Sequence, residues 1–161
     1  MSDVDPLSLD LATLSWLAGS AANELLLSTI QKGGHPRLRI SHGYVFQMLI
    51  SGPKTIGTLA EQLGVTQQAA SKVVGELTRY GYLTSVICED DRRLRQVGLS
   101  KLGNEAVETA RSARTELEGR LLSSLDSHTM ASARRALACL LDAAGGLEAA
   151  RRRRVRYPKL E

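Results

Sequence analysis

The sequence predicts a mainly α-helical protein with one small β-hairpin. Of its 161 residues, 43% are hydrophobic but only 4% are aromatic, a balance that favours Leu/Ala helix packing over a β-sandwich. Most of the chain has apolar residues at helical spacing, whereas the stretch after Gly81 is rich in Val, Ile and Thr. A chain of this length suits one domain whose core needs no disulfide or metal.

The N-terminal part is expected to form two helices, over about residues 9–31 and 41–50, after a loose tail at residues 1–8. The first helix has one apolar stripe and further apolar residues outside it, which predicts more than one neighbouring element. The stripe consists of Leu14, Leu17, Ala18, Ala21 and Leu25, and the outlying residues are Trp16, Leu26 and Leu27. Gly33, Gly34 and Pro36 end this helix.

Residues 55–79 have the pattern of two short helices joined by a tight turn. In both, apolar residues recur at i, i+3, i+4 and i+7, namely Ile56, Leu59, Ala60 and Leu63, then Ala70, Val73, Val74 and Leu77. Gly64 suits the end of the first helix because glycine tolerates positive φ. Thr66 suits the N-cap of the second. Two helices so joined form a helix-turn-helix.

The second of these helices has a polar face with no acidic residue before Glu76. Gln can pair with adenine, Ser can contact a base or a phosphate, and Lys can reach guanine or the backbone. The plain alternative is a solvated helix face. The candidate DNA contacts here are Thr66, Gln67, Gln68, Ser71, Lys72 and Arg79. Gly75 on the same helix either permits close approach to a phosphate or clears space for the hairpin that follows.

That hairpin is predicted from strands at residues 83–88 and 97–99, joined by a charged loop at residues 89–96 with three arginines. A basic hairpin after a recognition helix is a wing, which can lay arginine into the adjacent minor groove. Its candidate DNA contacts are Asp91, Arg92, Arg93 and Arg95. The hairpin favours DNA binding over a merely solvated face, and the fold class becomes a winged helix-turn-helix.

Over about residues 40–103 the sequence resembles the MarR-type winged helix-turn-helix regulators. The matching pieces are LAEQLGVTQQAASKVVGELTRYGYL, the wing motif Asp91-Arg92-Arg93 and the exit LSKLG at residues 99–103. The resemblance implies that Arg93 reaches the minor groove while Asp91 orients it. The chain differs from the family in lacking a proline before the aspartate, and in Thr84-Ser85-Val86 where an arginine is common.

The C-terminal part is expected to form a long helix from a Ser100 cap to about Leu125, and a last helix over about residues 128–144. One small domain cannot cover all the apolar surface of such helices, so a second copy of the chain is the simplest partner. The resemblance likewise implies a dimer formed by the first and last helices. A two-fold dimer would place its recognition helices about 10 bp apart on an inverted-repeat operator.

These patterns divide the chain into four parts. Residues 1–39 are an N-terminal dimerisation helix, residues 40–103 the DNA-binding domain, and residues 104–150 the C-terminal dimerisation helices. Residues 151–161 are a basic tail, which either contacts phosphates or remains a solvated or acid-paired segment. The net charge of +4 and the pI near 9.3 agree with an anionic partner.

The expected function is that of a cytoplasmic, homodimeric transcription regulator, more specifically a ligand-responsive repressor. The resemblance implies a small-molecule effector bound between the dimerisation and DNA-binding parts, where Trp16 and His42 are candidate pocket residues. Ordinary helix packing is the alternative for both side chains. The rival function is a winged-helix module that binds other proteins without specific DNA binding.

The sequence gives no sign of an enzyme, a cofactor or a metal. The three histidines lack ligand spacing, no Gly-rich phosphate loop follows a strand, and Asp90-Asp91 lies among arginines that keep it ionised. Cys88 and Cys139 form no C-x-x-C motif, which fits a reducing compartment. Cys88 is expected to be a structural thiol, with oxidant sensing as its alternative. No signal segment or long apolar run is present, which favours the cytoplasm.

Overall fold

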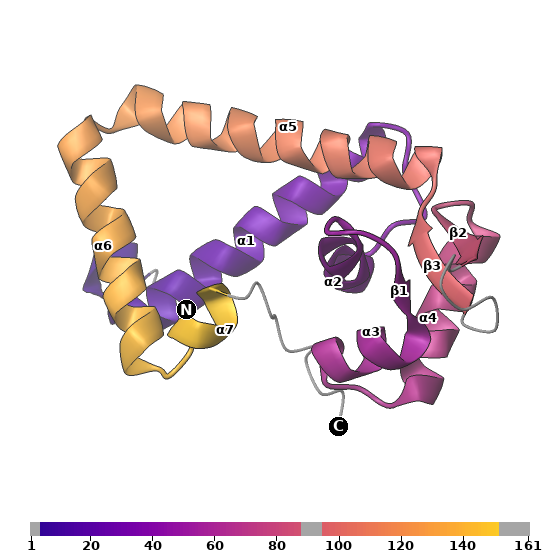
Figure 1. Ribbon diagram of the computed structural model, residues 1–161. Coiled ribbons are helices and arrows are strands. Elements are labelled where there is room, and N and C mark those ends of the chain that lie inside the picture. Colours follow the sequence, from indigo (N-terminus) through magenta and orange to yellow (C-terminus); the bar gives the residue numbers. More distant parts are fainter. Residues whose placement is uncertain (1–3, 88–94, 152–161) are drawn as a thin grey trace.

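The computed structural model describes residues 4–87 and 95–151, which are mostly helical with a three-stranded antiparallel sheet (Figure 1). The predicted fold class is therefore confirmed. The elements in chain order are η1 (Pro6–Ser8), α1 (Leu11–Lys32), α2 (Ile40–Leu49), β1 (Lys54–Thr55), α3 (Ile56–Leu63), α4 (Gln67–Arg79), β2 (Leu83–Ile87), β3 (Arg95–Leu99), α5 (Lys101–Ser124), α6 (Ser127–Ala143) and α7 (Leu147–Arg151).

The helix boundaries come from local capping groups, most of which the sequence predicted. Thr66 caps α4 by accepting a hydrogen bond from the Ala69 N–H at 3.1 Å, and Ser100 caps α5 through the Gly103 N–H at 3.0 Å. Both caps satisfy a first-turn donor that has no partner within its helix. Gly64 ends α3 in the left-handed region, with φ of 68°.

The sheet has the strand order β1-β3-β2. Strands β2 and β3 form the predicted hairpin, with Leu83 opposite Leu99 and Ile87 opposite Arg95. Strand β1 was not predicted, because two residues are too few to show a periodicity. It pairs with β3, with Lys54 opposite Val97. The predicted loop contacts Asp91, Arg92 and Arg93, together with Cys88, lie outside the described residues.

The buried core joins α2, α3, α4, the sheet and the start of α5 into one unit, here called the head. Leu59 of α3 and Leu77 of α4 are fully buried. Phe46 of α2 and Tyr82 pack with their ring centroids 5.9 Å apart. The apolar core residues are Leu38, Val45, Phe46, Met48, Leu49, Leu59, Leu63, Val74, Leu77, Tyr82, Leu83, Val97, Ala106 and Val107. The orientation of α4 is thus fixed by side chains from every neighbouring element.

A close backbone contact joins the long helix α5 to the head. Tyr82 O accepts a hydrogen bond from the Ser100 N–H at 3.0 Å. A Cβ added at Gly103, in the first turn of α5, would lie only 2.2 Å from the same oxygen. Only glycine lets the two backbones approach this closely. The direction of α5 is therefore set by the head itself.

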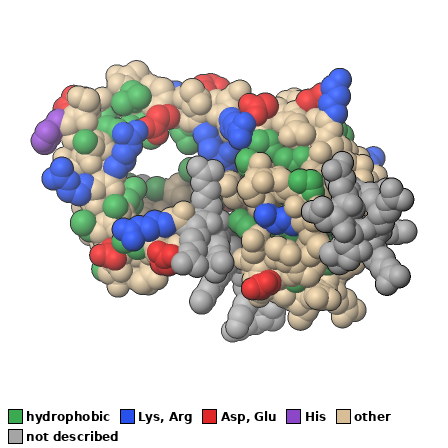
Figure 2. All heavy atoms as spheres, viewed as in Figure 1, with side chains coloured by type: hydrophobic (Ala, Val, Ile, Leu, Met, Phe, Trp, Pro, Cys, Tyr) green, Lys and Arg blue, Asp and Glu red, His purple; other side chains and the backbone are tan. Residues whose placement is uncertain are grey.

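Helices α1, α5 and α6 form an open frame beside the head (Figure 1). An ion pair from Arg134 to Glu118 connects α6 with α5. Figure 2 shows an opening through the chain inside this frame, with hydrophobic side chains along its rim. The predicted surplus of apolar surface is present: the exposed large hydrophobic residues of the frame are Leu11, Trp16, Leu17, Leu25, Leu121, Leu122, Leu137 and Leu141, with Leu125 at the α5–α6 joint.

The two ends of the described chain differ slightly from prediction. Pro6–Ser8 form a single 3-10 turn within the expected loose tail, because Asp5 accepts a hydrogen bond from the Leu7 N–H at 3.0 Å. After α6, Gly145 adopts a φ of 71° and a short α7 follows. Across the described residues, no helix combines the length and the apolar character needed to cross a membrane.

Replacing Gly103 with Ala is expected to destabilise the protein by about 1–3 kcal/mol, because the new Cβ must push α5 away from Tyr82. Gly119→Ala on the same helix is the matched control. No atom lies within 4 Å of a Cβ there, so this change should stabilise the helix by about 0.4–1 kcal/mol. Urea unfolding measures the free energy of unfolding of the two variants. If both substitutions changed it in the same direction, the proposed role of the close contact would be contradicted.

Candidate nucleic-acid interface

Helix α4 buries one face in the head and leaves the other free. Ala70, Val74 and Leu77 are buried, as the apolar spacing predicted, and Val73 is half-buried. The residues on the opposite side, here called the reading face, are exposed: Gln67, Gln68, Ser71, Lys72, Gly75 and Arg79, with Thr66 at the N-cap. The structure thus brings together all six helix-turn-helix residues that the sequence singled out.

Gly75 leaves an open space on the reading face. Among the described residues, no atom lies within 4 Å of a Cβ built at this position. The described part of the hairpin therefore does not need the space that Gly75 provides.

Two arginines lie over one aromatic ring at the C-terminal end of α4. The Arg79 guanidinium carbon lies 5.7 Å from the Tyr80 ring centroid, and that of Arg37 lies 5.2 Å from it. Such cation–π contacts restrict long side chains that would otherwise be free. Sequence reasoning missed Arg37, because it precedes α2 and only the fold brings it beside α4.

Glu76, the acidic residue of α4, is turned away from the reading face. It is 18% exposed and forms an ion pair with Arg39, which directly precedes α2. Its other oxygen accepts a hydrogen bond from the Tyr80 hydroxyl at 3.0 Å. Because this pairing neutralises Glu76, the charge on the exposed side of α4 comes from Lys72 and Arg79.

His42 lies fully buried beneath this ion pair. Its Nδ1 accepts a hydrogen bond from the Arg39 backbone N–H at 3.3 Å. Its Nε2 lies 3.2 Å from an Arg39 guanidinium nitrogen and 3.6 Å from Glu76 Oε2. Burial, reinforced by the positive charge of Arg39, lowers the pKa of His42 despite the opposing effect of Glu76.

The pKa of Glu76 is also lowered. Partial burial acts to raise it, but the hydrogen bond from Tyr80 and the charge of Arg39 together outweigh that effect. The carboxylate therefore stays ionised and paired at neutral pH. Arg39, His42, Glu76 and Tyr80 link the start of α2 to the recognition helix, and this cluster is called the α2–α4 cluster below.

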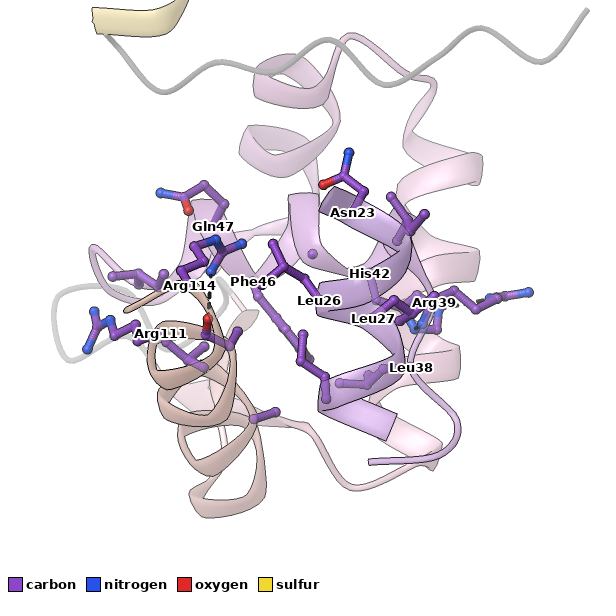
Figure 3. A pocket seen from close by; sticks show the side chains of 17 residues that line it. Asn23, Leu26, Leu27, Leu38, Arg39, His42, Phe46, Gln47, Arg111 and Arg114 are labelled. Atoms are coloured by element: carbon purple, nitrogen blue, oxygen red, sulfur yellow. Dashed lines mark hydrogen bonds between the residues drawn. The ribbon is translucent and has the colours of Figure 1, made fainter. Parts of the chain in front are cut away.

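A cavity of about 360 Å³ lies between α1, α2 and α5 (Figure 3). Its lining combines apolar side chains, among them Leu26 and Leu27 from α1 and Phe46 from α2, with polar and charged ones. The charged or titratable residues that line it are Arg39, His42, Arg111 and Arg114. Of the two predicted effector residues, His42 contributes to the lining, whereas Trp16 is 70% exposed and lies outside it.

The remaining candidate residues are placed only in part. Arg95 begins β3, opposite Ile87. Cys139 is a free, exposed thiol on α6. Within residues 4–87 and 95–151, no group of three or more His, Cys, Asp or Glu side chains is placed to hold a metal ion.

Comparison with known proteins matches part of the chain to one family. Residues 38–94 match the model of the MarR family, which confirms the resemblance predicted from the sequence. No curated protein matches the chain.

Several solved structures share the fold over most of the chain. RV1404 from Mycobacterium tuberculosis has a TM-score of 0.73 and 22% identity, and the match covers 90% of this chain and 99% of that one. YusO from Bacillus subtilis has a TM-score of 0.67 and 21% identity, covering 88% and 99%. FabT from Streptococcus pneumoniae, solved in complex with DNA, has a TM-score of 0.66 and 19% identity, covering 83% and 95%.

Stability is expected to fall as the pH drops below about 6.5, the ordinary pKa of histidine. The pKa of His42 is lowered in the folded protein, so the unfolded chain takes up the proton first and unfolding is favoured. The slope can reach about 1.4 kcal/mol per pH unit for one group. Glu76 adds a loss of the same sign at lower pH, as the pH falls below its ordinary value of 4.5.

Urea unfolding between pH 7.5 and 5.5 measures this slope. His42→Gln should flatten it, whereas the control His128→Gln, an exposed position on α6, should keep it. A His42→Gln protein with the full slope would show that another group carries the pH dependence.

Proposed function

We propose that this protein, whose residues 38–94 match the MarR family, is a transcription regulator that binds double-stranded DNA as a homodimer. The observation that carries the proposal is the reading face. A helix firmly packed on one side presents amide, hydroxyl and cationic groups on the other, while its acidic residue is paired away from them. A major groove accepts one α-helix and offers partners for each of these groups.

The residues of the reading face divide into two roles. Gln68 and Ser71, near the N-terminal end of α4, are proposed to read base edges, because recognition helices contact bases with their N-terminal residues. Lys72, Arg79 and Arg37 are proposed to contact phosphates, which fix the register of a protein on the duplex. The wing roles of Asp91 and Arg93 remain proposals from the family resemblance.

The homodimer is supported by the frame of α1, α5 and α6. Its exposed leucines and the opening in Figure 2 are hydrophobic surfaces that a second copy can cover. The Gly103 contact sets the direction of α5 relative to the head. A two-fold contact between the frames of two copies would therefore also fix the spacing of their reading faces. The proposed target is an inverted repeat with half-sites about 10 bp apart.

Regulation by a small molecule is supported by the cavity, whose volume lies within the usual range of about 300–1,000 Å³ for ligand sites. It lies between α1 and α5 of the frame and α2 of the head, so a ligand there contacts both parts. We propose that the chain acts as a repressor, because a dimer on an operator blocks polymerase sterically, and that a ligand relieves it. A repressor of this kind acts in the cytoplasm.

The experiment that tests the function is recovery and sequencing of genomic DNA fragments bound by the purified protein, followed by affinity measurements at several salt concentrations. Enrichment of an inverted repeat, with an affinity that falls steeply with log salt, is the expected result. The rival function, a protein-interaction module, predicts neither an enriched sequence nor such a slope.

Variants of neighbouring residues on α4 are expected to have different effects. Lys72→Ala should weaken binding to all sequences and reduce the salt slope by about one, because one phosphate is no longer neutralised. Gln68→Ala should instead change the preferred base at one position of each half-site, at a cost of about 1–3 kcal/mol for the original base. Arg135→Ala on α6 is the control for the loss of one positive charge. If Gln68→Ala weakened binding to all DNA sequences equally, Gln68 would only position the protein on the DNA and would not read a base.

The dimer is tested by sedimentation of variants in the frame. Leu137→Asp and Leu122→Asp place a charge at apolar side chains that are 49% and 50% exposed in the single chain. Both should shift the protein to monomer, because a buried unpaired carboxylate costs several kcal/mol. Thr84→Asp, an exposed position on β2, should leave the dimer intact. A monomeric parent protein would refute the dimer directly.

A further inference from the structure

Arg39 and His42 both lie close to one oxygen of Glu76 within the α2–α4 cluster. Arg39 forms an ion pair with Glu76 Oε2, and His42 Nε2 lies 3.6 Å from the same oxygen. We propose that a proton taken up by His42 transfers Glu76 from Arg39 to the imidazolium, and that the released Arg39 strengthens DNA binding. The effect on DNA rests on the proposed function, whereas the exchange of partners concerns the protein alone.

The groups around His42 decide which partner each form of the ring prefers. The Arg39 backbone N–H lies 3.3 Å from Nδ1, and an Arg39 guanidinium nitrogen lies 3.2 Å from Nε2. A neutral imidazole has one acceptor nitrogen and can serve one of these donors, whereas the imidazolium has none. The protonated ring therefore repels the guanidinium and attracts the carboxylate of Glu76, which accepts hydrogen bonds and carries the opposite charge.

The charged side chains around His42 come from α4, from α5 and from the residue that precedes α2. Glu76 and Arg39 act on the ring directly, and Arg111 and Arg114 of α5 line the cavity together with it (Figure 3). The residues of α1 that line this cavity are uncharged, namely Asn23, Leu26, Leu27 and Ile30. Burial and the charge of Arg39 lower the pKa of His42 below its ordinary value of 6.5, against the effect of Glu76. The exchange is therefore expected in acidic solution, below pH 6.5.

The exposure of the three side chains suits such an exchange. The Arg39 side chain is 59% exposed, whereas that of His42 is fully buried. Water hydrates the guanidinium once it is released, so Arg39 leaves the ion pair at little cost. The other oxygen of Glu76 keeps its hydrogen bond from the Tyr80 hydroxyl at 3.0 Å. The carboxylate therefore stays in place while its charged partner changes.

The exchange adds one uncompensated positive charge at the start of α2. Arg39 and Glu76 compensate each other while His42 is neutral, and after protonation His42 compensates Glu76 instead. The free Arg39 then joins Arg37 and Arg79, which lie over one aromatic ring at the C-terminal end of α4 and are proposed to contact phosphates. One further phosphate contact in each protomer should increase the affinity for DNA by about two- to eightfold at about 0.1 M salt, because the contact releases counterions.

Stability and DNA affinity are therefore expected to change in opposite directions on acidification. Because the pKa of His42 is lowered in the folded protein, its protonation reduces the free energy of unfolding. The same proton strengthens DNA binding, and bound DNA must increase the proton affinity of His42 by the same factor. A histidine with a purely structural role would change the stability alone.

NMR titration of the full chain without DNA tests the exchange. The His42 ring should take up a proton in the folded protein between about pH 7 and pH 5, and the Arg39 guanidinium signal should shift with the same midpoint. Arg39→Gln should raise the pKa of His42 and Glu76→Gln should lower it, because each removes one opposing charge. Glu116→Gln, which removes a carboxylate from an exposed pair on α5, should leave this pKa unchanged. A ring that stays neutral until the protein unfolds, or an Arg39 signal that does not follow it, would refute the exchange.

Salt-dependent DNA affinities at about pH 7.5 and pH 5.5 test the consequence, with the fragment recovered with the parent protein. On acidification, the parent should gain affinity, and its slope of log affinity against log salt should steepen by about one for each protomer. His42→Gln should lose the gain, because Gln takes up no proton, and Arg39→Gln should lose the steepening. His128→Gln, at an exposed position on α6, should keep both.

The outcomes separate this inference from the proposed function. If the protein binds no DNA, the proposed function and the effect on DNA both fail, while the NMR titration still decides the exchange. If DNA is bound and the parent shows no gain on acidification, or His42→Gln shows an equal gain, the effect of the exchange on DNA binding is refuted and the proposed function stands.

Discussion

The structure depends on how one helix is held. Helix α4 has to bury Ala70, Val74 and Leu77 completely in order to present its other side, and the fully buried Leu59 and Leu77 show how closely α3 and α4 pack. The side chains that fix the helix are distinct from those that would meet DNA. The exposed side of α4 can therefore change in sequence without disturbing its packing.

A second constraint fixes the direction of α5, and so of the frame, relative to the head. Gly103 and Ser100 bring the first turn of α5 against the Tyr82 carbonyl, so the long helix cannot pivot freely on the head. Any contact that α5 makes with a second copy then acts on both reading faces. The LSKLG segment at residues 99–103 thus fixes α5 to the head. Its serine caps the helix, and its glycine permits the close approach to the Tyr82 carbonyl.

Local signals in the sequence were sufficient for most of the fold. Thr66, Gly64 and Ser100 act on neighbours within a turn, so their roles could be predicted from the chain alone. Strand β1 has too few residues for a pattern and becomes visible only when β3 lies beside it. The same limit applies to the candidate site: Arg39 and Glu76 are 37 positions apart, and no periodicity connects them. Trp16 is 70% exposed on α1, so a role for it in a ligand pocket stays a prediction.

The partial exposure of the α2–α4 cluster decides how firmly it ties α2 to the recognition helix. A fully buried ion pair would cost several kcal/mol to break. A fully solvated pair would contribute almost nothing to stability. With Arg39 largely exposed and Glu76 mostly covered, the pair lies between these limits, so it restrains α4 against α2 without locking the two helices together.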